Sequence, residues 1–252
     1  MPHPFLNGWI AQSKLTLPDF LETLMHPLPV LDGPTLAPAS GGPPKQLVIL
    51  LHGYGSNGND LISLAPYWHQ AVPDALFLAP NAPEQVPGMR GAYQWWDLST
   101  RDRASRAAGA ARAGPVLDAY IDQQLARYGL AEEQLVIVGF SQGTMMALHV
   151  GPRRERQLAG IVGYSGMLAD TDSLSRDART RPPVLLVHGS ADATISISSY
   201  QEAKDHLERL GFDVSSHVSA GLGHSVDMAG LELGKEFVRR VLGGCAPASP
   251  AS

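Results

Sequence analysis

The pentapeptide Gly139–Gly143, Gly-Phe-Ser-Gln-Gly, places a serine in a setting suited to covalent chemistry. It closes an apolar run at 134–140 and opens a helical pattern at 144–150. A serine on such a sharp strand-to-helix turn projects its hydroxyl over the sheet edge, and the flanking glycines avoid collisions with neighbouring backbone. The helix that follows favours negative charge at its start. This short pattern also arises by chance in ordinary turns, but its context predicts Ser141 as a nucleophile.

A serine hydroxyl is a weak nucleophile at neutral pH, so a base and an orienting acid are required elsewhere. On a sheet of this kind they follow the serine in the order acid, then histidine. The strand-like segment 183–187 runs directly into Asp192, which is therefore expected at the same sheet edge as Ser141. The alternative for Asp192 is an ordinary turn aspartate. Three aspartates on the preceding connection compete for the role: Asp170, Asp172 and Asp177.

The base is expected after the last strand-like segment, 213–218. His224 lies there between small residues, just before the C-terminal helix, so its imidazole can turn towards Ser141. The other eight histidines fit the role less well, because they lie within or at the end of strands, on helices, or before the serine: His3, His26, His52, His69, His149, His188, His206 and His217. A single histidine is usually structural, but His224 completes an ordered set.

An acyl-transfer site also needs two backbone N–H groups that hold the oxyanion. Gln142, directly after the nucleophile, supplies the first. The second is expected from Tyr54 in the loop 52–58, because the flanking glycines let the backbone approach a ligand closely. A phosphate cradle is the alternative reading of this glycine-rich loop. The loop has neither the P-loop lysine nor the dinucleotide pattern with its following acid, which argues against nucleotide binding.

Strand and helix patterns alternate along the chain, which predicts an α/β fold with a mostly parallel, twisted sheet and helices on both faces. Strands are expected at 46–51, 75–79, 134–140, 158–164, 183–187 and 213–218. Helices are expected at 59–71, 107–128 (broken at Pro115), 142–150, 199–210 and 226–242. Residues 1–44 are interpreted as an arm with an antiparallel edge strand, 45–244 as one domain, and 245–252 as a flexible tail.

Seven motifs together resemble the phospholipase/carboxylesterase family, the small α/β-hydrolases with little or no lid that include acyl-protein thioesterases. They are His52–Gly55, Ala79–Pro83, Trp95–Asp97, Gly139–Gly143, Ser165–Gly166, His188–Asp192 and Gly221–His224. The resemblance implies hydrolysis of carboxylic esters or thioesters by a Ser-Asp-His triad without a cofactor. A carboxylesterase is the first interpretation. An acyl-protein thioesterase, a lysophospholipase, a serine peptidase and a non-catalytic ligand-binding relative are the alternatives.

Substrate-binding residues are harder to find in the sequence. Trp96 lies in the long connection after Ala79–Pro80, and Met167 and Leu168 follow the strand expected at 158–164. Connections at the carboxyl edge of a sheet often wall the binding pocket, so these three residues are candidates for an acyl-binding wall. The alternative is that they pack the loops against the core, as apolar side chains usually do.

The bulk composition fits one soluble domain. The 252 residues carry a mild net charge of -5 and no basic stripe with aromatics, which argues against nucleic acid as a partner. The longest aliphatic run, 47–51, is too short for a transmembrane segment, and the first residues show no secretory signal. With the single cysteine Cys245 this predicts a cytoplasmic protein. The histidines show no metal-ligand spacing, so no metal is expected. A small-molecule ester or thioester is the expected partner, and a homodimer is possible.

Overall fold

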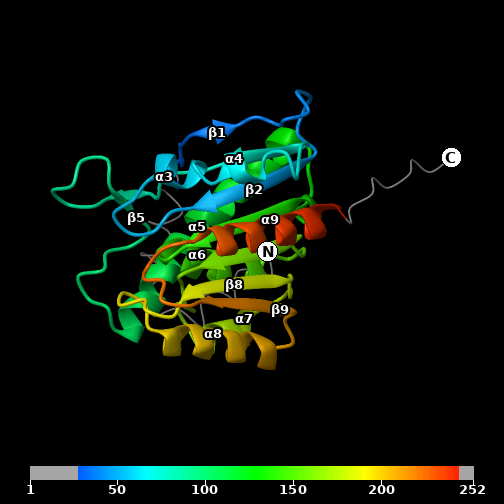
Figure 1. The fold of residues 1–252 in the computed structure, drawn as a ribbon. Coiled ribbons are helices and arrows are strands. Elements are labelled where there is room, and N and C mark those ends of the chain that lie inside the picture. The colour runs from blue at the N-terminus through cyan, green and yellow to red at the C-terminus, as the bar shows by residue number, and fades with distance from the viewer. Residues whose placement is uncertain (1–27, 244–252) are drawn as a thin grey trace, which may run out of the picture.

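A seven-stranded sheet forms the centre of the computed structural model, which describes residues 28–243 (Figure 1). Its strands run in the spatial order β1-β3-β2-β6-β7-β8-β9. All neighbouring strands are parallel except β1, which pairs antiparallel with β3 at one edge. The strands are β1 (Thr35–Leu36), β2 (Gln46–Leu51), β3 (Ala75–Leu78), β6 (Leu135–Phe140), β7 (Gly160–Tyr164), β8 (Val184–Gly189) and β9 (Val214–Ser219).

Helices cover both faces of this sheet. On one face lie α5 (Arg103–Tyr128), α6 (Gln142–Val150) and α8 (Ile197–Arg209), and on the other α3 (Gly58–Ile62), α4 (Ala65–Trp68) and α9 (Met228–Gly243). Helix α9 crosses the face nearer the viewer in Figure 1. The α/β-hydrolase fold class predicted from the sequence is confirmed. The division at residues 44 and 244 stays a prediction, and the arm up to residue 27 and the tail from 244 lie outside the described residues.

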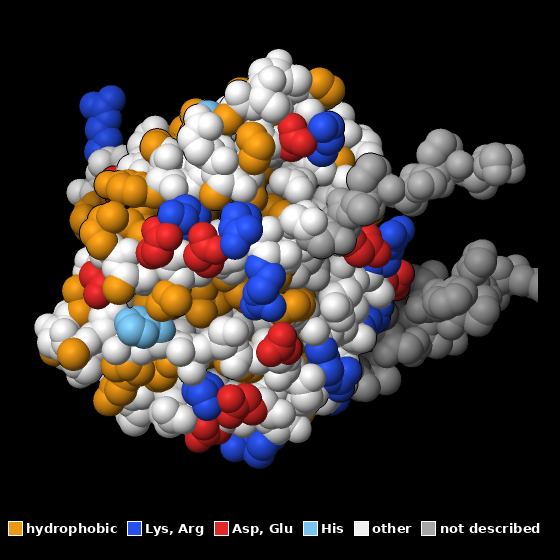
Figure 2. All heavy atoms as spheres, turned by 45° about the vertical axis from the view of Figure 1, so that its right-hand side comes forward, with side chains coloured by type: hydrophobic (Ala, Val, Ile, Leu, Met, Phe, Trp, Pro, Cys, Tyr) orange, Lys and Arg blue, Asp and Glu red, His pale blue; other side chains and the backbone are white. Residues whose placement is uncertain are grey.

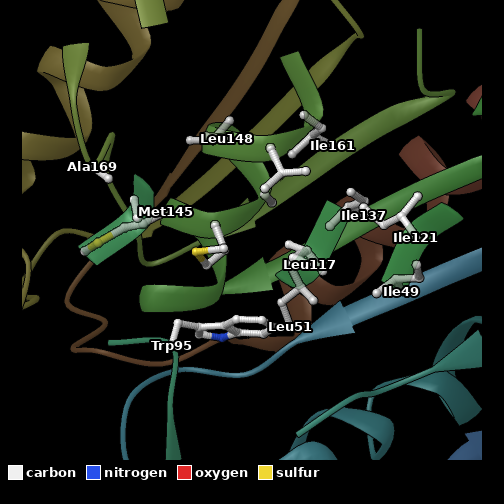
Figure 3. Packing of buried hydrophobic residues seen from close by; sticks show 14 of the residues in the cluster. Ile49, Leu51, Trp95, Leu117, Ile121, Ile137, Met145, Leu148, Ile161 and Ala169 are labelled. Atoms are coloured by element: carbon white, nitrogen blue, oxygen red, sulfur yellow. The ribbon is translucent and has the colours of Figure 1, made fainter. Parts of the chain in front are cut away.

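The strand β2 shows why this layered arrangement forms. Successive side chains of a strand point to opposite faces. Leu47, Ile49 and Leu51 therefore join the core under α5 and α6, where Figure 3 labels Ile49 and Leu51. Val48 and Leu50 join the core under α4 and α9. Both faces are apolar because both are covered by helices, as is typical of buried parallel strands. The continuous aliphatic run in the sequence is the consequence.

The helix expected at 59–71 is instead two short helices, α3 and α4. The side chain of Asn57 caps α3 by accepting hydrogen bonds from the N–H groups of Asn59 and Asp60. Pro66 lies in the first turn of α4, where its missing N–H costs nothing. A proline cannot donate within a helix interior, so the chain ends one helix and starts another. The indole N–H of Trp68 then donates to the Leu231 carbonyl at 3.0 Å and joins α4 to α9.

Helix α5 begins earlier than expected, at Arg103, and runs through Pro115 without a break. The side chain of Asp102 caps it by accepting from the Ser105 N–H at 2.8 Å. A proline inside a helix removes one hydrogen bond. Close packing compensates here: a Cβ on Gly109 would collide with Trp96, and one on Gly114 would press on His149 of α6. Tertiary contacts thus outweigh the local preference for a break.

A small hairpin and a short helix were not expected from the sequence. A small antiparallel hairpin, β4 (Glu84–Gln85) and β5 (Tyr93–Gln94), lies in the long connection after β3. Helix α7 (Thr171–Asp177) follows β7 and is capped by Asp170, whose carboxylate accepts from the Asp172 N–H at 3.1 Å. Both elements lie in connections that leave the carboxyl edge of the sheet.

The described part of the chain ends at the amino edge of the sheet, opposite the carboxyl edge. The side chain of Gln46, the first residue of β2, donates to the carbonyl of Leu242 in the last turn of α9 at 3.0 Å. On α9, Lys235 pairs with Glu232 and Arg239 with Glu236. Figure 2 shows charges of both signs interleaved across the face drawn there. None of the described helices is both long and apolar enough to cross a membrane.

Candidate active site

Ser141 lies on a strained turn between β6 and α6. Its backbone angles are φ 54° and ψ -114°, a conformation that a non-glycine residue adopts only when its surroundings impose it. The surroundings are tight: a Cβ on Gly139 would collide with the backbone of α6, and one on Gly143 with the Leu51 carbonyl. The Ser141 N–H donates to the Tyr164 carbonyl at 2.9 Å, which ties the turn to the end of β7.

His224 and Asp192 meet at the same sheet edge. The His224 Nδ1–H donates to Asp192 Oδ2 at 2.7 Å. The other oxygen, Oδ1, accepts from the N–H groups of Thr194 and Ile195 at 2.8 and 2.9 Å. Burial alone would raise the pKa of Asp192, but the hydrogen bonds from His224 and from these two N–H groups outweigh it and lower the pKa. An ionised Asp192 fixes the proton on Nδ1 and leaves His224 Nε2 free to act as a base.

Ser141 and His224 line one open cavity of about 350 Å³. The centroids of the Phe140 and His224 rings lie 5.0 Å apart, with the two rings tilted by 49°. The other side chains and backbone groups that line this cavity belong to the loop after β2, to α3 and its end, and to the segment after His224: Gly53, Tyr54, Ser56, Asp60, Leu61, Leu64, Ser225 and Val226. The cavity thus joins the candidate nucleophile, the candidate base and the glycine-rich loop.

The loop that carries Tyr54 is held by His52, whose ring is buried. His52 Nδ1–H donates to the Gly53 carbonyl at 2.7 Å, and Nε2 accepts from the Ala82 N–H at 2.9 Å. Burial lowers the pKa of His52, with a smaller opposing effect of the Gly53 hydrogen bond. A neutral ring matches the acceptor role of Nε2. Within residues 28–243 the Tyr54 N–H has no acceptor, as a donor to an oxyanion requires.

The side chain of Gln142 has a role that sequence reasoning missed. It is fully buried, its Oε1 accepts from the Trp95 N–H at 3.0 Å, and its Nε2 donates to the Trp96 carbonyl at 2.9 Å. The Trp95 indole N–H in turn donates to the His52 carbonyl at 3.0 Å. The long connection after β3 is therefore bound to both loops of the candidate oxyanion hole. In the sequence, the only signal for this role is that a glutamine directly follows the nucleophile.

The three candidates for the acyl-binding wall do not share the cavity of Ser141. Trp96 is 1% exposed and packs against Gly109 of α5. Met167 and Leu168 line a separate, smaller cavity together with Arg103 of α5 and other residues. Their role in binding an acyl group stays a prediction.

The competing acids are occupied elsewhere. Asp170 caps α7, and Asp172 pairs with Arg103 at 2.9 Å. Asp177 lies at the end of α7 and pairs with Arg176 at 3.0 Å. His224 has its ion-pair contact with Asp192, not with these three aspartates.

Two further residues support the histidine loop. The buried Ser165 hydroxyl, at the end of β7, donates to the Ser225 carbonyl next to His224 at 3.0 Å. His188, at the end of β8, donates through Nε2 to the Ile195 carbonyl at 2.9 Å and stacks on Tyr200. Both were present in sequence motifs but carried no assigned role. They hold the loops of His224 and Asp192 against the strand ends. Among the described residues no group of three or more His, Cys, Asp or Glu side chains could hold a metal ion.

The fold defines the protein as an α/β-hydrolase, with a serine elbow and a histidine–aspartate pair at the carboxyl edge of its sheet. The family model described as Phospholipase/Carboxylesterase matches residues 37–242, and the chain belongs to this family.

Two curated proteins and one solved structure illustrate the relationship. Acyl-protein thioesterase 1 of Gibberella zeae is 28% identical over 214 residues, covering 77% of this chain and 90% of the relative. Esterase YpfH of Escherichia coli K12 is 24% identical over 197 residues, covering 78% and 83%. The crystal structure of esterase PE8 is 41% identical with a TM-score of 0.80, covering 84% of this chain and 99% of that one.

Proposed function

We propose that this chain is a carboxylesterase that cleaves esters through an acyl-enzyme on Ser141. The observation that carries the proposal is the 2.7 Å hydrogen bond between His224 and Asp192 in a site whose cavity also contains Ser141. The family supports hydrolysis of esters or thioesters in general. The preference for oxygen esters is the finer part, and it draws support from the 41% identical structure named an esterase.

The proposed reaction follows from the geometry of these groups. His224 Nε2 takes the proton of the Ser141 hydroxyl as its oxygen attacks the ester carbonyl. The N–H groups of Tyr54 and Gln142 hold the oxyanion, aided by the positive end of α6. His224 then gives the proton to the leaving alcohol, while Asp192 stabilises the charged imidazolium. Water cleaves the acyl-enzyme by the same route.

Covalent labelling tests the nucleophile. A fluorophosphonate should label the parent protein on Ser141, and Ser141→Ala should lose both the label and at least about 10³-fold in kcat. Ser165 offers a sharp comparison, since it also follows a strand with positive φ but is buried and hydrogen-bonded. Ser165→Ala should still be labelled on Ser141. A label on Ser165 in the parent protein would overturn the assignment.

The thioesterase alternative shares every proposed catalytic group, so only substrates distinguish it. Matched acyl esters and acyl thioesters with the same chain, together with a lysophospholipid, should be compared by kcat/KM. We expect the ester to be preferred. A thioester preference of tenfold or more, about 1.4 kcal/mol in transition-state binding, would favour the thioesterase activity of the Gibberella zeae relative.

The cytoplasmic location and the homodimer are also proposals. The first rests on the single cysteine of the sequence, Cys245, and cell fractionation would test it. Light scattering on the purified chain would test the second.

A further inference from the structure

The cavity that contains Ser141 is asymmetric in charge. Among the described residues that line it, Asp60 is the only carboxylate, Tyr54 and His224 are the other ionisable side chains, and there is no lysine or arginine. The remaining walls are largely apolar and include Leu61, Leu64 and Val226. A substrate in this cavity therefore meets a carboxylate and no permanent positive charge.

The carboxylate of Asp60 is only partly satisfied. Its Oδ2 accepts from the Ser56 hydroxyl at 2.6 Å, which fixes the side chain at the start of α3. Within residues 28–243, Oδ1 has no hydrogen bond and the group has no ion-pair partner. The charge of Asp60 reaches the neighbouring loop, because it favours the protonated form of His52. Burial has the larger effect, so the pKa of His52 is lowered overall. Asp60 thus has a free oxygen available to a ligand.

Tyr54 lines the same cavity as this carboxylate. Its side chain is 38% exposed although large, and its hydroxyl has no partner among the described residues. An aromatic face attracts cations, and alkylated ammonium groups are bound by such rings in combination with apolar walls. A carboxylate, an aromatic ring and aliphatic side chains together match the chemistry of an alkylammonium group.

The position of His224 indicates which part of a substrate this wall meets. The general acid must reach the leaving oxygen, so the leaving alcohol lies against His224. Val226, Leu61 and Asp60 line the same cavity as His224. Because the leaving alcohol lies in this shared cavity, it is a part of the ester that can meet the carboxylate.

We propose that the Ser141 cavity selects esters whose alcohol carries a cationic alkylammonium group, bound by Asp60 and Tyr54. This proposal rests on the proposed esterase function and names the substrate class of the same site. It separates this chain from enzymes that select anionic leaving groups, which a carboxylate at the wall repels.

Two esters of the same shape test the selectivity directly. Choline acetate and 3,3-dimethylbutyl acetate differ only in the quaternary nitrogen that replaces a quaternary carbon. The measured quantity is the ratio of their kcat/KM values for the parent, for Asp60→Asn and for Asp205→Asn. Asp205 is a matched control, because it is a partly exposed acid on α8 outside the cavity and its replacement changes the net charge equally.

The parent should prefer the choline ester at low salt, and Asp60→Asn should lower the ratio by about threefold, as expected for one exposed charge contact. High salt should lower the parent's ratio in the same direction. Tyr54→Leu keeps the backbone N–H and should also lower the ratio. Asp205→Asn should keep the parent's ratio.

The opposite results would overturn the proposal. In one, the parent prefers the neutral ester. In the other, Asp60→Asn has the same ratio of kcat/KM values as the parent. A parent that is labelled on Ser141 by a fluorophosphonate but hydrolyses neither acetate also contradicts this proposal alone. Absence of labelling contradicts the esterase function itself, and the substrate class with it.

Discussion

The side-chain carbonyl of Gln142 accepts a hydrogen bond from the backbone N–H of Trp95, 47 residues away in the chain. The same side chain donates to the Trp96 carbonyl, so one buried amide satisfies two backbone groups of the connection after β3. Its own backbone begins α6 directly after Ser141. The residue therefore couples the serine turn to a long loop that has little regular structure of its own.

Replacing Gln142 by leucine should reduce the free energy of unfolding by about 2 kcal/mol, since the Trp95 N–H and the Trp96 carbonyl lose their partners while buried. Urea denaturation measures the effect. Gln201→Leu is the control, because Gln201 is exposed and its side chain donates to Asp205 on the same helix. A loss equal in the two variants would show that the buried amide contributes nothing particular.

Replacing Asp192 by asparagine should lower kcat by about 10⁴ with little change in substrate binding, because the amide no longer holds the proton on His224 Nδ1. Steady-state kinetics on a simple ester measures this. Asp170→Asn and Asp172→Asn, at the start of α7, are matched controls and should stay close to the parent. A large loss in either of them, with Asp192→Asn still active, would move the acid to the connection after β7.

Replacing Gly143 by alanine should destabilise the fold by about 1–3 kcal/mol or prevent folding, because the added Cβ meets the Leu51 carbonyl, which is backbone and cannot move aside. Gly223→Ala provides the comparison, since a Cβ there meets nothing within 4 Å although the residue adjoins His224. Thermal unfolding of both variants decides between them. A Gly143→Ala protein as stable as the parent would contradict the packing described for the turn.

His149 should make the protein less stable in acid. Burial, and then the charge of Arg153, lower its pKa to about 4, despite the opposing charges of Asp170 and Asp177. The unfolded chain has a histidine pKa of about 6.5, so it takes up a proton before the folded protein does. The neutral His149 ring therefore contributes its full stabilisation above a pH of about 6.5, and this contribution is lost as the pH falls towards 4.

The measurement is urea denaturation of the parent and of His149→Gln at about pH 8 and about pH 5. The parent should lose on the order of 1–2 kcal/mol more than the variant between these two conditions. His52, whose pKa is also lowered, contributes with the same sign in both proteins and cancels in the comparison. Parallel losses in the two proteins would contradict the assignment to His149.

The sequence predicted those features that depend on local pattern. The aliphatic runs became β2, β3 and β6, and the serine turn lies between β6 and α6 as expected. The features that the sequence did not reveal depend on packing between residues that are far apart in the chain. The continuity of α5 through Pro115 requires contact with Trp96 and α6, which no local pattern encodes.

The same reason explains the incomplete prediction of the site. The place of Asp192 and His224 follows from chain order and strand ends, and they do make contact. The wall of the Ser141 cavity instead comes from α3 and from the segment after His224. Trp96 belongs to an apolar core, and a sequence does not show whether a tryptophan faces a cavity or a helix.

The hydrogen bond between Gln46 and Leu242 has a practical consequence for handling the protein. It holds the end of α9 at the amino edge of the sheet, whereas Ser141 lies at the carboxyl edge. A linker joined at residue 243 would therefore depart from the side remote from the cavity mouth. Immobilising the enzyme on a resin through that end should leave the mouth facing the solution, so that substrate diffuses in unobstructed.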